Sequence, residues 1–172
     1  VPAQWLAHDL PLTDPTSLLI TPDHYVNRLL HAHGVSLTEL GVGQEGPLDE
    51  ASSRQAFRTL CAPWPVSRGT PVRSWLADQL AGIFGVTVRP AADTADEIYD
   101  EIAQALADTA FRPRALYDRF DIEVLATTDD PSDDLAAHRF LAADPTWSGR
   151  VIPTFRPDRY LEVGAASWHT DA

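Results

Sequence analysis

Two short apolar runs, each ending abruptly in polar and charged residues, constrain the fold of this chain more than any other feature. They read D-I-E-V-L-A-T-T-D-D-P over residues 121–131 and V-I-P-T-F-R-P-D over residues 151–158. This pattern is typical of buried parallel strands that present side chains at their C-terminal ends. Residues 132–141 between them have helical spacing, with Asp133 and Asp134 favouring the helix N-terminus. The sequence therefore predicts strand, helix and strand, with parallel strands whose polar ends are neighbours.

Helix signals occupy most of the chain before this unit. Thr21 and Thr70 are each followed by proline, which predicts a capped helix start at both positions. We expect an irregular lead-in over residues 1–20, a helical subdomain over residues 21–120 and the strand–helix–strand unit over residues 121–172. This order is compatible with an α/β protein in which an α-helical insertion leads into a (β/α)-barrel. Two strands cannot close a barrel, so only part of one is expected.

The composition limits the possible partners. With 172 residues, 44% of them apolar and 22% charged, the chain is expected to be globular. Its net charge of −12 argues against binding nucleic acid, because phosphate contacts need clustered cations. The longest apolar run falls short of the roughly 18 residues of a membrane span, so a soluble protein is expected. The single Cys61 fits a reducing cytoplasm, and the start at Val1 without any methionine predicts a processed chain or an excerpt.

Arg156 and two aspartates are the candidate site residues at the predicted sheet edge. Arg156 follows the second apolar run, and a guanidinium can bind a carboxylate in a planar, bidentate way. The alternative is an ion pair of Arg156 with Asp158 or Asp129. Asp129 and Asp130 could act as bases or orient Arg156, since paired carboxylates push their pKa values apart. For Asp130, which precedes a proline, capping of the next helix is the alternative.

Three histidines and a tyrosine lie in the first predicted helix. His24 and Tyr25 occupy its first turn, where backbone donors and the helix dipole attract a carboxylate. From the residues alone, the favoured interpretation is a core tyrosine and a solvated histidine. His31 and His33 form a His-x-His pair, but on a helix the two side chains point about 200° apart. Stabilisation of the helix C-terminus therefore explains this pair better than metal binding.

The motifs T-T-D-D-P and T-F-R-P-D, together with D-H-Y at residues 23–25, resemble those of uronate isomerase, also called glucuronate isomerase, of the amidohydrolase superfamily. The resemblance runs over most of the chain. It implies part of a (β/α)8 TIM-type barrel preceded by an α-helical insertion domain. It also implies interconversion of D-glucuronate with D-fructuronate, and of D-galacturonate with D-tagaturonate. A proton moves between C2 and C1 through an enediol in this reaction.

The same resemblance implies the roles of individual residues. Tyr25 matches a catalytic residue that transfers a proton or contacts a hydroxyl, whereas His24 and Arg156 match substrate-binding residues. The complete family enzyme is expected to hold a divalent metal, with zinc as the expected ion, and to form a homo-oligomer. Its metal ligands are expected before Val1 and after Ala172, so the segment alone is expected to bind no metal at that site and to be inactive. The expected partner is a sugar acid, without nucleic acid or membrane.

Two alternative functions follow from the same sequence. A relative within the superfamily could be a metal-dependent hydrolase of a small ester, lactone or amide, because related barrels host many reactions. Such an enzyme would retain a water-activating metal centre. A truncated, non-catalytic helical interaction module would instead form oligomers or bind a partner. An exposed apolar patch would favour that alternative.

Overall fold

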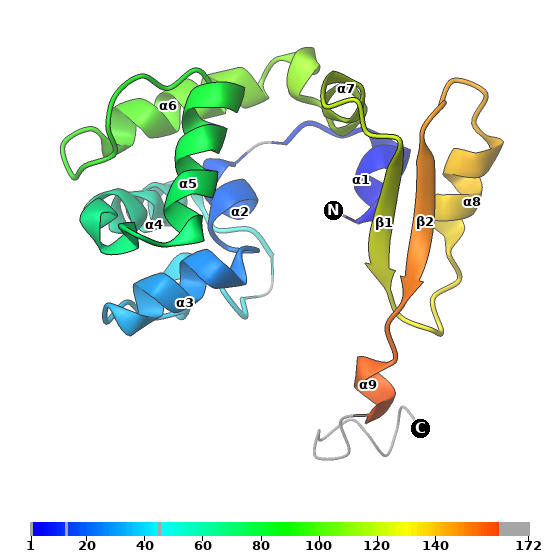
Figure 1. The fold of residues 1–172 in the computed structure, drawn as a ribbon, viewed down its shortest axis with the longest axis horizontal. Helices are drawn as coiled ribbons and strands as arrows, with labels where there is room; N and C mark the ends of the chain where they lie inside the picture. The colour runs from blue at the N-terminus through cyan, green and yellow to red at the C-terminus, as the bar shows by residue number, and fades with distance from the viewer. Residues whose placement is uncertain (1, 13, 45, 162–172) are drawn as a thin grey trace. The chain divides into compact units, whose positions relative to one another are not determined.

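The structure is a computed structural model that describes residues 2–12, 14–44 and 46–161 (Figure 1). It contains two compact units, Leu12–Phe111 and the combination of Val1–Pro11 with Arg112–Ala172. We call them the helical unit and the strand unit and describe each by itself. The helical unit contains α2 (Pro15–Leu19), α3 (His24–Ala32), η1 (Thr38–Leu40), α4 (Glu50–Cys61), η2 (Trp64–Ser67), α5 (Pro71–Asp78), η3 (Gln79–Ile83), α6 (Ala95–Leu106) and η4 (Thr109–Phe111). The strand unit contains α1 (Ala3–His8), α7 (Pro113–Arg119), β1 (Val124–Asp129), α8 (Ala136–Ala143), β2 (Arg150–Phe155) and α9 (Asp158–Leu161).

Aspartate caps start several helices of the helical unit. The carboxylates of Asp14, Asp23 and Asp49 accept hydrogen bonds from backbone N–H groups in the first turns of α2, α3 and α4. These caps satisfy donors that have no partner within the helix. The predicted cap of α5 by Thr70 is confirmed, whereas α3 begins at His24 after Asp23 and not at Thr21. An aspartate two residues after the threonine therefore displaces the predicted cap.

The helical unit has a continuous apolar core. Phe57 on α4 packs edge to face against Tyr99 on α6, with ring centroids 5.6 Å apart. Ile98 and Ile102 lie on the buried face of α6, as their helical spacing predicts. Across the surface of the same two helices, Arg58 pairs with Asp96, but this exposed ion pair adds little stability. Burial of the apolar faces therefore stabilises this unit. None of the helices in the described part of the chain is long and apolar enough to cross a membrane.

The prediction of an irregular lead-in is wrong for its described residues, 2–12 and 14–20. They contain α1 and α2, because Pro2 and Pro15 stand at the helix starts and do not interrupt the helices. Leu6 and Ala7 of α1 are buried, and they belong to the core of the strand unit. The helix α7 belongs to the same unit, so the contacts divide the chain at residue 112 and not at the predicted residue 121.

The strand unit confirms the predicted order of strand, helix and parallel strand. Its sheet has two strands, β1 and β2, which pair in parallel. Leu125 and Val151 face a small core that Leu6, Tyr117 and Leu141 of three helices complete. Figure 1 shows α8 beside β2, and the two elements are in contact. The predicted connecting helix is shorter than expected, since it begins at residue 136.

Burial of the strands was predicted for both faces, but the helices cover only part of one face. On that face Leu125, Thr127 and Val151 are buried or half-buried, whereas Pro153 and Phe155 near the end of β2 are exposed. The side chains of the opposite face are exposed on both strands. They are Val124, Ala126 and Thr128 on β1 and Arg150, Ile152 and Thr154 on β2. In a parallel strand, successive side chains point to opposite faces, so these residues form one open face. An apolar run alone does not reveal which of the two faces is covered.

Candidate functional site

The register of the sheet brings the two predicted motifs together at one edge. Thr128 lies opposite Thr154, and Asp129 lies opposite Phe155, at the C-terminal ends of the two parallel strands. The prediction that the polar ends of both runs are neighbours is therefore confirmed. In open α/β sheets this edge is where ligands commonly bind.

Asp129 points toward the helix-covered face, where it belongs to a partly buried polar cluster with Thr127 and His138. The Thr127 hydroxyl donates to Asp129 Oδ2 at 2.6 Å, and His138 Nε2 lies 2.7 Å from the Thr127 oxygen. Because the single hydroxyl proton of Thr127 goes to Asp129, the network assigns the donor role to Nε2–H of His138. His138 Nε2 is also 3.7 Å from Asp129 Oδ2. We call these three residues the strand-end clamp, because they join the end of β1 to α8.

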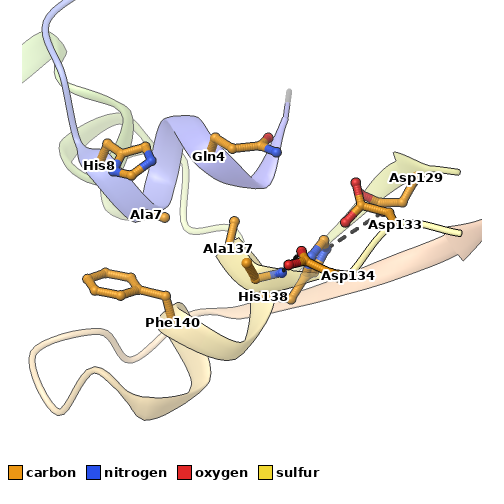
Figure 2. A pocket seen from close by; sticks show the side chains of 10 residues that line it. Gln4, Ala7, His8, Asp129, Asp133, Asp134, Ala137, His138 and Phe140 are labelled. Atoms are coloured by element: carbon orange, nitrogen blue, oxygen red, sulfur yellow. Dashed lines mark hydrogen bonds and ion pairs between the residues drawn. The ribbon is translucent and has the colours of Figure 1, made fainter.

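The strand-end clamp borders a pocket of about 330 Å³ within the strand unit. Figure 2 shows the contact between Asp129 and His138, with Asp133 and Asp134 beside them. The latter two carboxylates accept hydrogen bonds from the backbone N–H groups of Leu135 and of the residue after it. These aspartates therefore stabilise the start of α8, as predicted, and they are not free ligands.

Asp130 has a local structural role in the turn after β1. Its Oδ1 accepts hydrogen bonds from the backbone N–H of Ser132 at 2.8 Å and from the Ser132 hydroxyl at 2.6 Å. The hydroxyl of Tyr160 donates to the same oxygen at 3.2 Å. Asp130 therefore caps the turn after β1, whereas the alternative, capping of the next helix, is wrong.

Arg156 forms the ion pair that was the alternative to substrate binding. Its Nε donates to Asp158 Oδ2 at 2.8 Å, and both side chains are about half exposed. This hydrogen bond raises the pKa of Arg156 and holds the pKa of Asp158 below its usual value. The contact occupies one edge of the guanidinium and fixes its plane, so Asp158 can orient Arg156 for a second carboxylate.

His24 and Tyr25 lie in the helical unit, at the start of α3. Tyr25 is 50% exposed, so its interpretation as a core residue is wrong. Its ring centroid lies 5.6 Å from that of Trp75 in an edge-to-face arrangement and 4.1 Å from that of His24. The expected backbone donors are already used, because Asp23 Oδ1 accepts from Tyr25 N–H and Val26 N–H. A substrate carboxylate here would have to meet side chains.

The histidine pair and the cysteine do not form a metal site. His31 Nδ1 lies 2.9 Å from the carbonyl oxygen of Val35, and His33 caps the C-terminus of α3. Within residues 2–12, 14–44 and 46–161 there is no group of three or more His, Cys, Asp or Glu side chains placed to hold a metal ion. Cys61 is buried, and this burial raises the pKa of its thiol to about 12, so it is a neutral core residue.

The roles of Thr127 and His138 were not predicted from the sequence. The His138 side chain is only 10% exposed, and its partner Thr127 lies on another element. The spacing of Thr127 and Asp129 could have indicated this cluster, because side chains two residues apart on a strand lie on the same face. The predicted site residues thus form two groups, with Tyr25 in the helical unit and Arg156 in the strand unit.

Comparison with known proteins gives the family. The family model for glucuronate isomerase matches residues 2–171 of this chain. The chain belongs to the glucuronate isomerase family. It is 59% identical to a uronate isomerase of Cutibacterium acnes over 98% of its length and 36% of that protein, and 47% identical to a uronate isomerase of Corynebacterium efficiens over 96% and 35%.

Solved structures agree with this family assignment. The crystal structure of glucuronate isomerase from Caulobacter crescentus matches 99% of this chain with a TM-score of 0.90 and 38% identity. That match covers 35% of the crystallised chain. A uronate isomerase structure from Thermotoga maritima matches with a TM-score of 0.83 and 26% identity. The present chain therefore spans about a third of the length of the family members it matches.

Proposed function

We propose that this chain is a segment of a uronate isomerase that converts D-glucuronate to D-fructuronate and D-galacturonate to D-tagaturonate. The match of residues 2–171 to the glucuronate isomerase family, with 59% identity to one member, carries this proposal. In the reaction a base removes the proton from C2, and an acid delivers a proton to C1. The C1 carbonyl becomes a hydroxyl while the C2 hydroxyl becomes a carbonyl, so no atoms are gained or lost.

The proposed architecture is a partial (β/α)8 barrel with an α-helical insertion. The parallel pairing of β1 with β2 supports it, as do the helices that cover one face of the pair. In such a barrel the open face of the two strands would point inward. The C-terminal strand ends, which carry Thr128 and Arg156, would then lie on the side where barrel enzymes bind their substrates.

Arg156 is proposed to bind the substrate carboxylate. Its guanidinium is half exposed, and Asp158 holds it through Nε, which leaves the terminal nitrogens suited to a second acceptor. Tyr25 is proposed to transfer a proton or contact a hydroxyl, with its ring oriented by Trp75. His24 is proposed as a substrate ligand. Asp129 and Asp130 are proposed to hold the end of β1.

The complete enzyme is proposed to hold a divalent metal, with zinc as the expected ion, through residues outside this chain. The described residues offer no set of ligands that fits such an ion, so no reaction step is derived through it. A homo-oligomeric state and a cytoplasmic location belong to the same proposal. The hydrolase and the interaction module are not favoured, because the family and the matched relatives are isomerases.

The test is isomerisation by the complete polypeptide that includes residues 1–172, with formation of the ketose followed by NMR. Arg156→Met should lower kcat/KM by about 10- to 150-fold, since hydrogen bonds to charged groups contribute about 1.5–3 kcal/mol. Arg139→Met is the matched control, because Arg139 is also exposed and paired with an aspartate in the strand unit. It should change kcat/KM by less than about 2-fold.

Three outcomes would contradict parts of this proposal. Lack of uronate conversion by the unaltered complete polypeptide would refute the isomerase activity. Equal effects of Arg156→Met and of the control would remove Arg156 from the site. Turnover by residues 1–172 alone would show that the segment already contains the complete catalytic machinery.

A further inference from the structure

Thr128 and Thr154 form a pair at the C-terminal edge of the sheet. They lie directly opposite each other in the register of β1 and β2. Neighbouring strands are about 4.8 Å apart, so the two side chains lie side by side on one face. This is the open face, because Thr127 on the opposite face is 2% exposed and belongs to the strand-end clamp. The pair therefore projects away from the helices of the strand unit.

The hydroxyls of this pair differ from that of Thr127 in their surroundings. Both Thr128 and Thr154 are exposed, whereas Thr127 contacts Asp129 and His138. In the described part of the chain, neither hydroxyl of the exposed pair has a hydrogen-bond partner. Each hydroxyl can donate one hydrogen bond and accept two, as a sugar hydroxyl can. Two adjacent hydroxyls are thus available to a polyhydroxylated ligand.

Arg156 lies one residue beyond the end of β2. It follows Thr154 by two residues in the sequence, so its backbone is close to the threonine pair. Its Nε is held by Asp158, so the guanidinium is anchored near the end of β2. A cationic group beside a pair of neutral hydroxyls complements a carboxylate with hydroxyls on the adjacent carbons.

We propose that Thr128 and Thr154 bind a hydroxyl of the sugar acid while Arg156 holds its carboxylate. This inference rests on the proposed function and names two specificity-determining residues for it. Arg156 alone would accept any carboxylate, whereas the threonine pair favours a carboxylate that carries hydroxyls. A site built to hydrogen-bond a hydroxyl discriminates against an analogue that lacks it.

The test replaces each threonine by valine and by serine in the complete polypeptide. Valine keeps the branched shape that suits a strand and removes only the hydroxyl, whereas serine keeps the hydroxyl. Thr128→Val and Thr154→Val should each lower kcat/KM for D-glucuronate about 2- to 12-fold, mainly through KM. The serine variants and the control Thr87→Val, at an exposed position of the helical unit, should stay within about 2-fold of the unaltered enzyme.

A deoxy analogue of the substrate sharpens the result. If a threonine contacts the hydroxyl that the analogue lacks, its valine variant and the unaltered enzyme should turn over that analogue equally well. Unchanged kcat/KM in both valine variants would overturn the inference, as would serine variants that lose as much as the valine variants. Absence of isomerisation by the unaltered polypeptide would refute the proposed function instead, so the two failures are distinguishable.

Discussion

The helical unit and the strand unit differ in how completely they bury their apolar side chains. In the helical unit, large side chains such as Phe57 and Ile102 are at most 1% exposed and belong to one continuous core. In the strand unit, Leu6 and Leu141 are similarly buried, but the apolar Ile152 on the open face of the sheet is 36% exposed. The first unit is thus closed by its own residues, whereas the second leaves a sheet face exposed.

This difference means that the helical unit gains stability from its core, whereas the strand unit exposes polar side chains at its strand ends. A closed core makes stability a property of the unit itself, since burying a large apolar side chain stabilises by about 1.5–3 kcal/mol. An open sheet face provides little of this stabilisation, but it exposes the polar strand ends that include Thr128 and Arg156. The strand unit also has polar contacts between its elements, such as the strand-end clamp and the hydrogen bonds of Arg114 to Leu6 and Asp144.

Removing a large, fully buried core side chain of the helical unit should have the greatest effect. Phe57→Ala should lower the free energy of unfolding of this unit by about 3–5 kcal/mol, because it leaves a cavity against Tyr99. Denaturation with urea gives the size of the loss, and hydrogen exchange shows which amides are affected. Phe155→Ala removes the same group at a side chain that is 73% exposed, and it should change stability by less than about 0.5 kcal/mol.

Hydrogen exchange also tests the comparison itself. If the units are stabilised separately, Phe57→Ala should increase amide exchange in α4 and α6 and leave β1 and β2 nearly unchanged. Equal loss of protection in the strands would mean that the two units unfold together. The contrast between a closed and an open unit would then not extend to their stability.

Substitutions of the adjacent Thr127 and Thr128 allow a direct comparison of the two faces of β1. Thr127→Val should destabilise the strand unit by about 1–3 kcal/mol, because it leaves the buried groups of Asp129 and His138 without their partner. Thr128→Val, on the open face, should change stability by less than about 0.5 kcal/mol. Thermal unfolding measures both variants. Similar losses for the two variants would contradict the assignment of one covered and one open face.

Most of the fold followed from local patterns in the sequence. Proline after a capping residue predicted the start of α5, and the spacing of Ile98 and Ile102 predicted the buried face of α6. The two apolar runs predicted a parallel pair, which the register confirms. These features depend on neighbours within a few residues, so a single sequence contains them. The two helices of the lead-in do not follow from local patterns, because prolines occur both at helix starts and in irregular segments.

The candidate site was less predictable, because its contacts depend on the folded arrangement. The strand-end clamp joins Thr127 to His138, which are eleven residues apart and lie on different elements. The motif containing Arg156 and Asp158 was recognisable, but only the structure shows that these two side chains form an ion pair. The exposure of Tyr25 was likewise missed, since a tyrosine in the first turn of a helix can pack in the core or lie exposed against a neighbour such as Trp75.

The smallest expected effect concerns Asp144, which joins distant segments of the strand unit. Hydrogen bonds from the Thr146 hydroxyl and backbone N–H, together with Arg114, lower the pKa of Asp144 from 3.8 to about 2. A carboxyl with a lower pKa in the folded state stabilises the protein above its unfolded pKa, and this stabilisation is lost as the pH falls from about 4 to about 2. Asp144→Asn should therefore reduce the fall in melting temperature across this range. The control Asp78→Asn, at an exposed position of the helical unit, should keep the original pH dependence, and equal curves for both variants would contradict the role of Asp144.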